Sequence, residues 1–437
     1  MPNHTKAVPT PLWFLFIILV TFVSLPQTCL ASNSANGRLL CGTARLNITP
    51  DLPVTLAGYA GRDGLSTGIH DSLFVRVIAF EHNDHRLVLI ATDVIGFYNN
   101  TASIIQQNII EKTGLKPSEI YLSAIHTHSA PSIVLDESKG HANNVKYTRY
   151  LNGRIITAIE QTLAHKQPVQ LNSGSGSSPV GVNRRQVYYD ETGNPRMWIG
   201  RNSEGVADKE VQVLEIKQAS GNTVAVLFDY ATHSTSLGWK NYVISGDIHG
   251  IAEQFVEEYL GDGVIAPAFV GASGDIDPWY RVLPGFKTDR NWVPEPVLMG
   301  TLLGEEVIHV LQDMDDSFAD GPINSVFETL YLPGKSYGEM TVSESDTLTP
   351  LNISVARVGD IAFVGFGGEV LSEIGLAIKQ ASPFQQTFLI THCNGTSGYL
   401  VPKHRFNEQG YEVRSSPFAP DAADIVIKRI VKLLHQL

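Results

Sequence analysis

Residues 119–132 read EIYLSAIHTHSAPS, an apolar run that ends in two histidines, His126 and His128. A short run of this composition, bounded by turn-forming residues, predicts a β-strand. The apolar residues are continuous rather than alternating, so we expect the strand to be covered on both faces. The segment therefore predicts a buried strand that presents two imidazoles at the point where it ends.

Apolar runs rich in β-branched residues recur along the chain, and helical patterns lie between them. The other runs are RLVLIATD (86–93), VQVLEIK (211–217), TVAVLFDYATH (223–233), VIAPAFVGASGD (264–275) and IAFVGFGGE (361–369). Apolar stripes at helical spacing occupy residues 150–166, 246–262, 295–314 and 427–434. This alternation predicts an α/β or α+β fold in which helices cover mixed β-sheets in a single large domain. Residues 172–207, rich in Gly, Ser, Asn and Arg, predict a long irregular stretch, which indicates a functional loop.

The charge of the chain and its N-terminus restrict its class. The 437 residues carry a formal net charge of −12 and contain no block of lysine or arginine, which argues against a nucleic-acid groove. Lys6, the apolar run 11–25 and the small residues that follow it predict a signal peptide over residues 1–31. We therefore expect a secreted or periplasmic domain over residues 38–437. The alternative is a membrane anchor formed by an uncleaved N-terminal segment.

Two cysteines remain after the predicted cleavage. Cys41 and Cys393 would then lie in an oxidising compartment, where they could pair. Their separation along the chain says nothing about their distance in the fold.

Polar groups suited to chemistry follow several of the apolar runs. His233 ends one run, Asp275 and Asp277 follow another, and Glu369 ends a third. Active sites of sheet-based enzymes collect at such strand ends. Two histidines and one carboxylate would form a catalytic zinc site with an open position for water. The alternative is that each histidine is a hydrogen-bonded core residue.

The spacing of the paired histidines allows two arrangements. In a strand, residues i and i+2 share a face. His126 and His128 would then both face a metal, or one would face the metal and the other the substrate. From the residues alone, the pattern predicts a zinc hydrolase of unspecified substrate.

Further motifs extend this interpretation to a family. The chain resembles the catalytic domain of the neutral/alkaline (non-lysosomal) ceramidases, in order and over nearly all of residues 38–437. The matching motifs are AGYAG (57–61), GIHDSLFVRV (68–77), SAIHTHSAP (123–131), VNRR (182–185), YATHSTSLG (230–238), VISGDIHG (243–250), GASGDIDP (271–278), GGEVLSEIG (367–375) and GYLVPKHRFNEQGYE (398–412).

The resemblance implies a role for each of a small set of residues. It implies one Zn²⁺ held by His126, His233, Glu369 and Tyr399. It also implies that His128 faces the substrate as an acid/base or hydrogen-bonding group. Finally, it implies that Arg184 and Tyr411 orient the scissile amide, and the twelve-residue interval from Tyr399 to Tyr411 equals that in the family.

Two departures from the family pattern affect the expected substrate. The family carries a serine in the segment GDxSP, where this chain has Asp277. That carboxylate would act as a general base, as an additional anionic contact to the metal, or as a ligand of a second cation. Ceramidases also continue into an immunoglobulin-like domain, which we expect this chain to lack because its sequence stops at Leu437.

The leading hypothesis is a zinc-dependent hydrolase that cleaves an N-acyl amide bond of a small or lipid-like substrate, with association at a membrane surface. One alternative is an ester or another acyl substrate, and another is a non-catalytic, metal-stabilised binding protein. The sequence leaves the oligomeric state open. Residues 172–207 and 280–296 are expected walls of the pocket, through the aromatic residues Trp198, Trp279, Tyr280, Phe286 and Trp292, of which Trp279 directly precedes the second range.

Overall fold

A computed structural model of the chain describes residues 2, 37–98, 100–261, 263–280, 295–314, 320–335 and 348–437. Residues Gly37–Leu437 form a compact unit of their own. The predicted signal peptide lies outside the described residues except for Pro2, and so do residues 281–294 of the second expected pocket wall.

Two large β-sheets form the centre of the fold. Within the described residues, the first has the strand order β12-β10-β9-β6-β1-β3-β4-β5 and the second the order β14-β15-β16-β18. The pairs β4/β5, β10/β12 and β16/β18 are parallel and the other pairs are antiparallel. The mixed sheets of the predicted fold class are thus confirmed. The strands span β1 Leu40–Asn47, β3 Phe74–His82, β4 His85–Thr92, β5 Ile120–Ala124, β6 Gln167–Ser177, β9 Glu210–Gln218, β10 Thr223–Tyr230, β12 Ala268–Val270, β14 Ile323–Pro333, β15 Leu348–Val358, β16 Ile361–Phe366 and β18 Gln386–Ile390.

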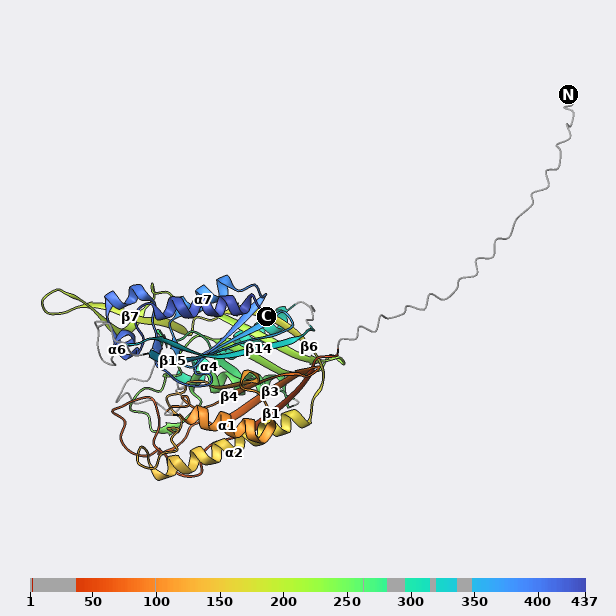
Figure 1. The fold of residues 1–437 in the computed structure, drawn as a ribbon, viewed down its shortest axis with the longest axis horizontal. Helices are drawn as coiled ribbons and strands as arrows, with labels where there is room; N and C mark the ends of the chain where they lie inside the picture. Colours follow the sequence, from red (N-terminus) through yellow and green to blue (C-terminus); the bar gives the residue numbers. More distant parts are fainter. Residues whose placement is uncertain are drawn as a thin grey trace. The chain divides into compact units, whose positions relative to one another are not determined.

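The sheets stack face to face, and helices cover their outer faces (Figure 1). In β4, Leu87 and Leu89 enter the core between the sheets, whereas Val88 and Ile90 pack in the core that includes α1 and α2. Both faces of this strand are therefore apolar, which explains its continuous apolar sequence. Helices α3 and α4 cover the other end of the first sheet, and α5 and α7 cover the second. The helices span α1 Thr101–Thr113, α2 Ala142–Ala164, α3 Asp247–Leu260, α4 Glu295–Asp313, α5 Ser372–Ala381 and α7 Ala422–Leu434.

The prediction of an irregular stretch over residues 172–207 is wrong. Most of it is strand, because β6 is followed by the hairpin of β7 (Gly181–Tyr189) and β8 (Pro195–Asn202). The glycines of β6 have a packing role. A Cβ atom at Gly174 would lie 3.0 Å from Met314 Cγ, and one at Gly176 would overlap the Glu306 carboxylate of α4. The glycine-rich composition reflects a helix packed closely on this strand, and not a loop.

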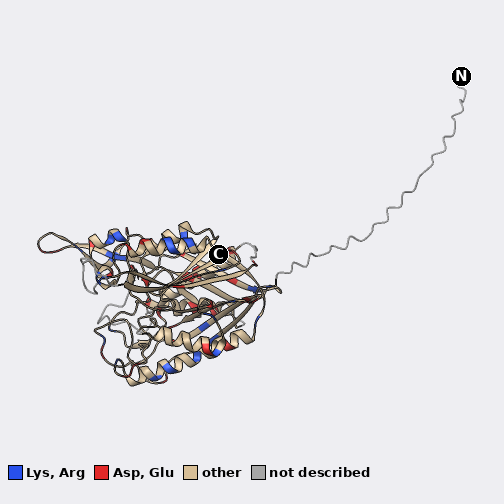
Figure 2. Ribbon diagram, in the orientation of Figure 1, with Lys and Arg blue, Asp and Glu red and all other residues tan. Residues whose placement is uncertain are grey.

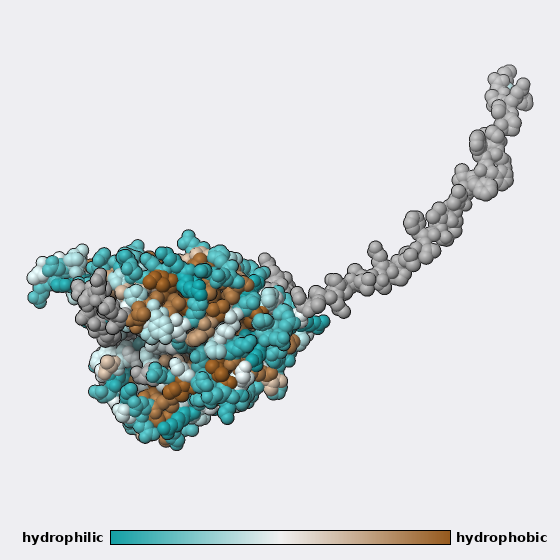
Figure 3. All heavy atoms as spheres, in the orientation of Figure 1, coloured by the Kyte–Doolittle hydropathy of each residue, from teal (hydrophilic) through white to brown (hydrophobic). Residues whose placement is uncertain are grey.

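The distal part of the β7–β8 hairpin extends away from the two sheets (Figure 1). Val187, Tyr189 and Trp198 lie there and are exposed. Lys and Arg positions alternate with Asp and Glu positions along the described elements (Figure 2), and polar areas separate the apolar patches on the face shown in Figure 3. Among the described helices, none combines the length and apolar character that crossing a bilayer requires. Cys41 and Cys393 are both buried as free thiols, so the suggested pairing is not formed.

Candidate metal centre and active site

The two sheets are joined where several of their strands end, and the predicted site residues lie at this joint. The side-chain Oδ1 of Asn394, after β18, accepts a hydrogen bond of 3.0 Å from Leu122 N in β5. The amide of Thr391 donates to Val270 O of β12 at 2.8 Å. These bonds hold the end of β18 against strands of the other sheet. They bring together loops that are far apart in sequence.

His126 and His233 enter this joint with their Nδ1 atoms already bonded. His126 Nδ1 lies 2.8 Å from Ile95 O, and His233 Nδ1 lies 2.9 Å from Ser273 O and 3.0 Å from Ile276 O. A carbonyl oxygen can only accept, so each Nδ1 carries the proton and each Nε2 carries a lone pair. Arg184 Nη1, which can only donate, lies 3.3 Å from His233 Nε2 and supports the same tautomer. Metal-binding histidines show this arrangement in general.

Glu369 lies opposite both of these lone pairs. Its Oε2 atom is 3.2 Å from His233 Nε2 and 3.7 Å from His126 Nε2, and it makes no hydrogen bond with any described residue. Burial raises the pKa of Glu369, and the hydrogen bond from the Tyr399 hydroxyl is among the interactions that lower it. Two histidine lone pairs and a carboxylate oxygen therefore converge on one point, where Arg184 Nη1 donates to the lone pair of His233. Zn²⁺ at about 2.0–2.1 Å from tetrahedral nitrogen and oxygen ligands would separate those ligands by about 3.3 Å, so the donor set fits zinc.

Tyr399 is held beside Glu369 by a short pair of parallel strands. In the pairing of β17 (Glu369–Val370) with β19 (Tyr399–Leu400), these two residues are direct neighbours. The phenol hydrogen-bonds the Glu369 carboxylate and accepts from Arg184 Nη2 at 3.1 Å. Burial and the nearby Glu369 charge hold the pKa of Tyr399 well above its usual range. The predicted fourth ligand thus lies next to the predicted third.

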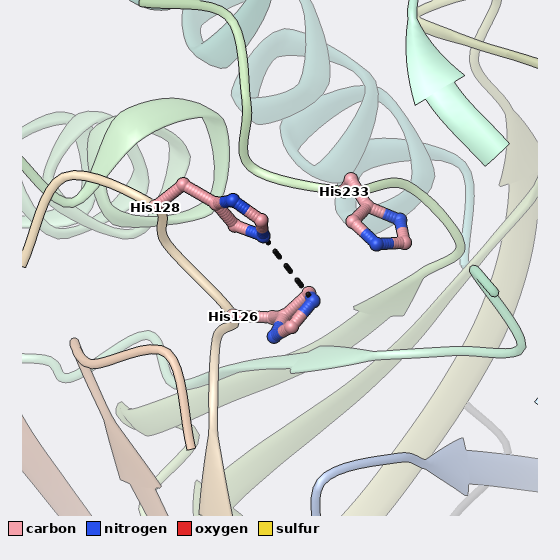
Figure 4. A group of neighbouring side chains, drawn as sticks. All are labelled: His126, His128 and His233. Carbon is pink, nitrogen blue, oxygen red and sulfur yellow. Dashed lines mark hydrogen bonds between the residues drawn. The ribbon is translucent and has the colours of Figure 1, made fainter. Parts of the chain in front are cut away.

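His128 approaches the same point from the other side. Its Nε2 lies 3.5 Å from His126 Nε2, and Figure 4 shows His126, His128 and His233 directed at one another. The three rings could hold a metal between them. Their supports differ, however, because His128 Nδ1 is buried and has no hydrogen-bond partner in the described part of the chain. His126 and His233 have the support expected of metal ligands and His128 does not, and the role of His128 at the substrate stays a prediction.

The structure corrects the geometric reason given for the paired histidines. Strand β5 ends at Ala124, and His126 has a left-handed φ of 56°. The two rings therefore do not share a strand face. The turn at His126 directs the two rings towards one point instead. A residue other than glycine in this conformation is uncommon outside turns and functional sites.

The AGYAG motif forms a support for His128. Gly58 has a φ of 97°, and a Cβ atom there would overlap the His128 ring. Tyr59 packs edge-on at 5.0 Å between ring centroids. Arg62 donates to His128 O at 2.8 Å and to carbonyls of residues 57, 238 and 239. The motif therefore fixes the position of the His128 loop.

Arg184 connects the candidate ligands with Asp277. Its Nε donates to Glu412 Oε1 at 2.8 Å, and its Nη1 lies 3.2 Å from Asp277 Oδ1. Asp277 is also paired through Oδ2 with Arg201 Nη1 at 3.2 Å. Asp277 is buried between two arginines, and this describes an anchor for Arg184 better than a free general base. Arg201 is a member of this network that was not predicted from the sequence.

A cavity of about 470 Å³ opens onto four of the candidate site residues, His126, His128, Glu369 and Tyr399. Tyr411, which begins α6 (Tyr411–Ser415), lies on its wall with its ring 5.6 Å from that of Tyr399. Within the described lining, the expected wall residues Trp198, Trp279 and Tyr280 do not occur. The lining is Thr55, Ala57, Gly58, Ile95, Tyr98, His126, His128, Ser132, Ile133, Val134, Lys139, Gly140, Glu369, Gly398, Tyr399, Tyr411 and Ser415.

His392 is a further member of the cluster that the sequence analysis missed. It follows β18 in the segment FLITH, a strand-end histidine like that of DYATH at His233. Its ring stacks on that of His126 at 3.7 Å between centroids and 16° between planes. His126, Glu369 and His392 form a second group with metal-ligand spacing. The strand-end pattern was a sufficient signal to find it.

The chain is similar to known proteins in sequence and in fold. The family model described as neutral/alkaline non-lysosomal ceramidase, N-terminal, matches residues 39–278, more than half of the chain. Neutral ceramidase 2 of Arabidopsis thaliana is 28% identical over 270 residues, which is 59% of this chain and 34% of that protein. Neutral ceramidase of Pseudomonas aeruginosa is 25% identical over 260 residues, 56% of this chain and 38% of that protein. The aligned part therefore spans little more than a third of these relatives.

The solved structures give the fold. The crystal structure of neutral ceramidase from Pseudomonas aeruginosa matches with a TM-score of 0.76, covering 92% of this chain and 75% of that chain at 18% identity. A ceramidase complexed with C2 matches with a TM-score of 0.75 at 17% identity. The two large sheets and their covering helices are thus an arrangement that this chain shares with those proteins.

Proposed function

The chain belongs to the neutral/alkaline non-lysosomal ceramidase family, and we propose that it is a zinc-dependent hydrolase that cleaves the N-acyl amide bond of a lipid-like substrate. His126, His233, Glu369 and Tyr399 would hold the metal. One observation carries the proposal: the lone pairs of His126 and His233 face a Glu369 oxygen at 3.7 and 3.2 Å, and this oxygen has no hydrogen-bond partner within the described part of the chain. Arg184 Nη1 donates to the His233 lone pair, and a metal cation among the acceptors would remove the repulsion that remains between them.

Zinc supplies a Lewis acid and lowers the pKa of a bound water. The residues of the chain provide the remaining functions. Arg184 is fixed by Glu412 and Asp277, and with Tyr411 it would donate hydrogen bonds to the carbonyl oxygen as charge develops there. His128 lies at the same point, and its Nδ1, which has no hydrogen-bond partner among the residues that the structure describes, supports a role in holding or moving a proton of the scissile group.

The cavity supports a substrate with both apolar and polar parts. Ile133 and Val134 give it an apolar wall, and Ser132 and Lys139 lie nearby on the same segment. An acyl chain and a hydroxylated or anionic amine portion would suit these two kinds of lining. Ceramide is one compound of this class.

A second candidate function is hydrolysis of a different acyl bond, such as an ester. The observation that favours it is the anchoring of Asp277 between Arg184 and Arg201, which leaves no hydroxyl at the position of the family's serine. An ester needs less assistance to its leaving group than an amide, because an alcohol departs more readily than an amine.

A panel of N-acyl amides and matched esters, assayed with the zinc-loaded full chain, tests both candidates. We expect turnover of the amides to exceed that of the esters and to disappear in His126→Ala and His233→Ala. His309→Ala is the matched control, because His309 is exposed on α4. Faster turnover of the esters would select the second candidate. Activity that survives both ligand substitutions would contradict a metal-dependent hydrolase.

A further inference from the structure

His392 is the residue of the cluster whose chemistry the proposed function leaves unexplained. Its side chain is fully buried, and neither ring nitrogen has a hydrogen-bond partner among the described residues. A neutral imidazole carries one N–H donor and one acceptor, and both are costly to bury without partners. A phenylalanine would fill the same space without that cost. The nitrogen atoms therefore require an explanation.

The backbone holds His392 in place by unusual means. Its φ is 52°, a left-handed value that residues other than glycine seldom adopt. Its amide donates to Gly368 O at 3.2 Å, the carbonyl just before Glu369. His126, on which it stacks, is also left-handed with a φ of 56°. Strained positions of this kind persist where the surrounding structure requires them, most often at functional sites.

The stacking geometry shows that His392 does not bind the same ion as His126. A metal lies in the plane of the imidazole that binds it. With the two rings 3.7 Å apart and only 16° from parallel, an ion in the plane of His126 lies out of the plane of His392. His392 therefore acts on the ligands and not on the ion.

We propose that His392 is a positioning residue of the metal centre, which fixes the ring plane of His126 by stacking and donates its ring N–H to the Glu369 carboxylate in the metal-bound state. The ligand atoms of His126, Glu369 and His392 already lie within 4.8 Å of one another. Carboxylates that bind metals are commonly oriented by such a hydrogen bond. This inference rests on the proposed function only for the presence of the metal.

Three substitutions separate the two contributions of His392. His392→Phe keeps an aromatic ring and lacks the N–H. His392→Asn keeps a donor, lacks the ring and tolerates the left-handed backbone. His392→Ala lacks both. His309→Ala, at an exposed histidine, is the control.

The measurement is zinc affinity of the full chain, by competition with a chromophoric chelator, together with the visible spectrum of the Co²⁺-substituted protein. We expect affinity to fall about 10-fold in the Phe and Asn variants and about 100-fold in the Ala variant, with the control unchanged. The intensity of the Co²⁺ absorption bands reports the coordination number, and it should equal the wild-type intensity in all variants. Melting of the metal-free proteins identifies any variant that fails to fold, and the Asn variant is the one least affected by backbone strain.

Two results would overturn the inference. Wild-type affinity in His392→Phe would show that the N–H is not used. A change of Co²⁺ coordination number in that variant would show that His392 binds the ion directly. Both results leave zinc binding by the wild type intact. Absence of zinc binding by the wild type itself would instead refute the proposed function together with the inference.

Discussion

Replacing Asp277 by the serine of the family pattern should lower both the stability and the turnover of this protein. In Asp277→Ser, Arg184 and Arg201 each lose an ion-pair contact of 3.2 Å. Removal of one member of a buried ion pair costs about 3–5 kcal/mol, because the remaining charge stays buried without that compensation. Arg184 keeps Glu412 at 2.8 Å, and the Arg201 side chain is 20% exposed. We therefore expect the free energy of unfolding to fall by about 3 kcal/mol, the lower end of this range.

The assay is denaturant unfolding of the metal-loaded full chain, with turnover measured on its best acyl substrate. Arg184 would lose one of the two carboxylates that fix it, so kcat should fall up to about 10²-fold, as for loss of an aligned donor. Adding Arg201→Gln to Asp277→Ser should restore about 1 kcal/mol, because the two residues are coupled. Asp421→Ser is the matched control, because its pair with Lys403 is exposed and should contribute little to stability.

Two results would refute this reasoning. One is an Asp277→Ser variant as stable as the wild type, which would mean that the two ion pairs contribute nothing. The other is a large gain in ceramide cleavage, which would mean that a hydroxyl at this position is sufficient and that the position of Arg184 is not limiting.

Three other perturbations have defined outcomes. Gly58→Ala should lower the free energy of unfolding by about 2 kcal/mol and kcat at least 10-fold, with zinc content unchanged, because the φ of 97° and the His128 ring leave no room for a Cβ atom. Gly153→Ala is the control, because the space around Gly153 is open. Equal effects of the two substitutions would contradict the prediction. Tyr399→Phe should lower zinc affinity about 10- to 100-fold in the chelator assay, and unchanged affinity would exclude the phenol as a ligand. Burial raises the pKa of Asp229 to about 7, against the opposing effects of Lys379 and the Leu389 amide, whereas in the unfolded chain it is about 3.9. Between pH 4 and 7 the folded protein keeps a proton that the unfolded chain releases, so the free energy of unfolding should fall as pH rises and level off above pH 7. Asp229→Asn should remove this slope, worth up to about 4 kcal/mol, in denaturant unfolding at pH 4.5 and 7.5, and an identical slope in the variant would contradict the assignment.

Much of the fold could be predicted because buried strands leave a strong signal. The runs at 86–93, 211–217 and 361–369 correspond to β4, β9 and β16. The same reasoning failed at β6, where Gly174 and Gly176 make room for α4. A glycine that permits close packing cannot be told from a glycine in a loop until the packed helix is known.

The site was predictable in part for a related reason. Strand ends identify candidate ligands such as His233 and Glu369, but they do not show which polar residues from other elements will reach them. Arg201 lies 76 residues before Asp277 and meets it only through the β7–β8 hairpin. His392 also follows an apolar run, so the strand-end pattern could have identified it. The support that distinguishes His126 from His128, a carbonyl at Nδ1, depends on tertiary structure alone.

The most direct test of the metal centre is an anomalous difference map, recorded at the zinc absorption edge from crystals of the full chain. The account predicts a single strong peak within about 2.0–2.2 Å of His126 Nε2, His233 Nε2 and a Glu369 oxygen, with the Tyr399 phenol as the fourth protein ligand. Two results would contradict this account. One is a map without a peak at these atoms, and the other is a peak within bonding distance of His128 or His392 in place of one of the four ligands.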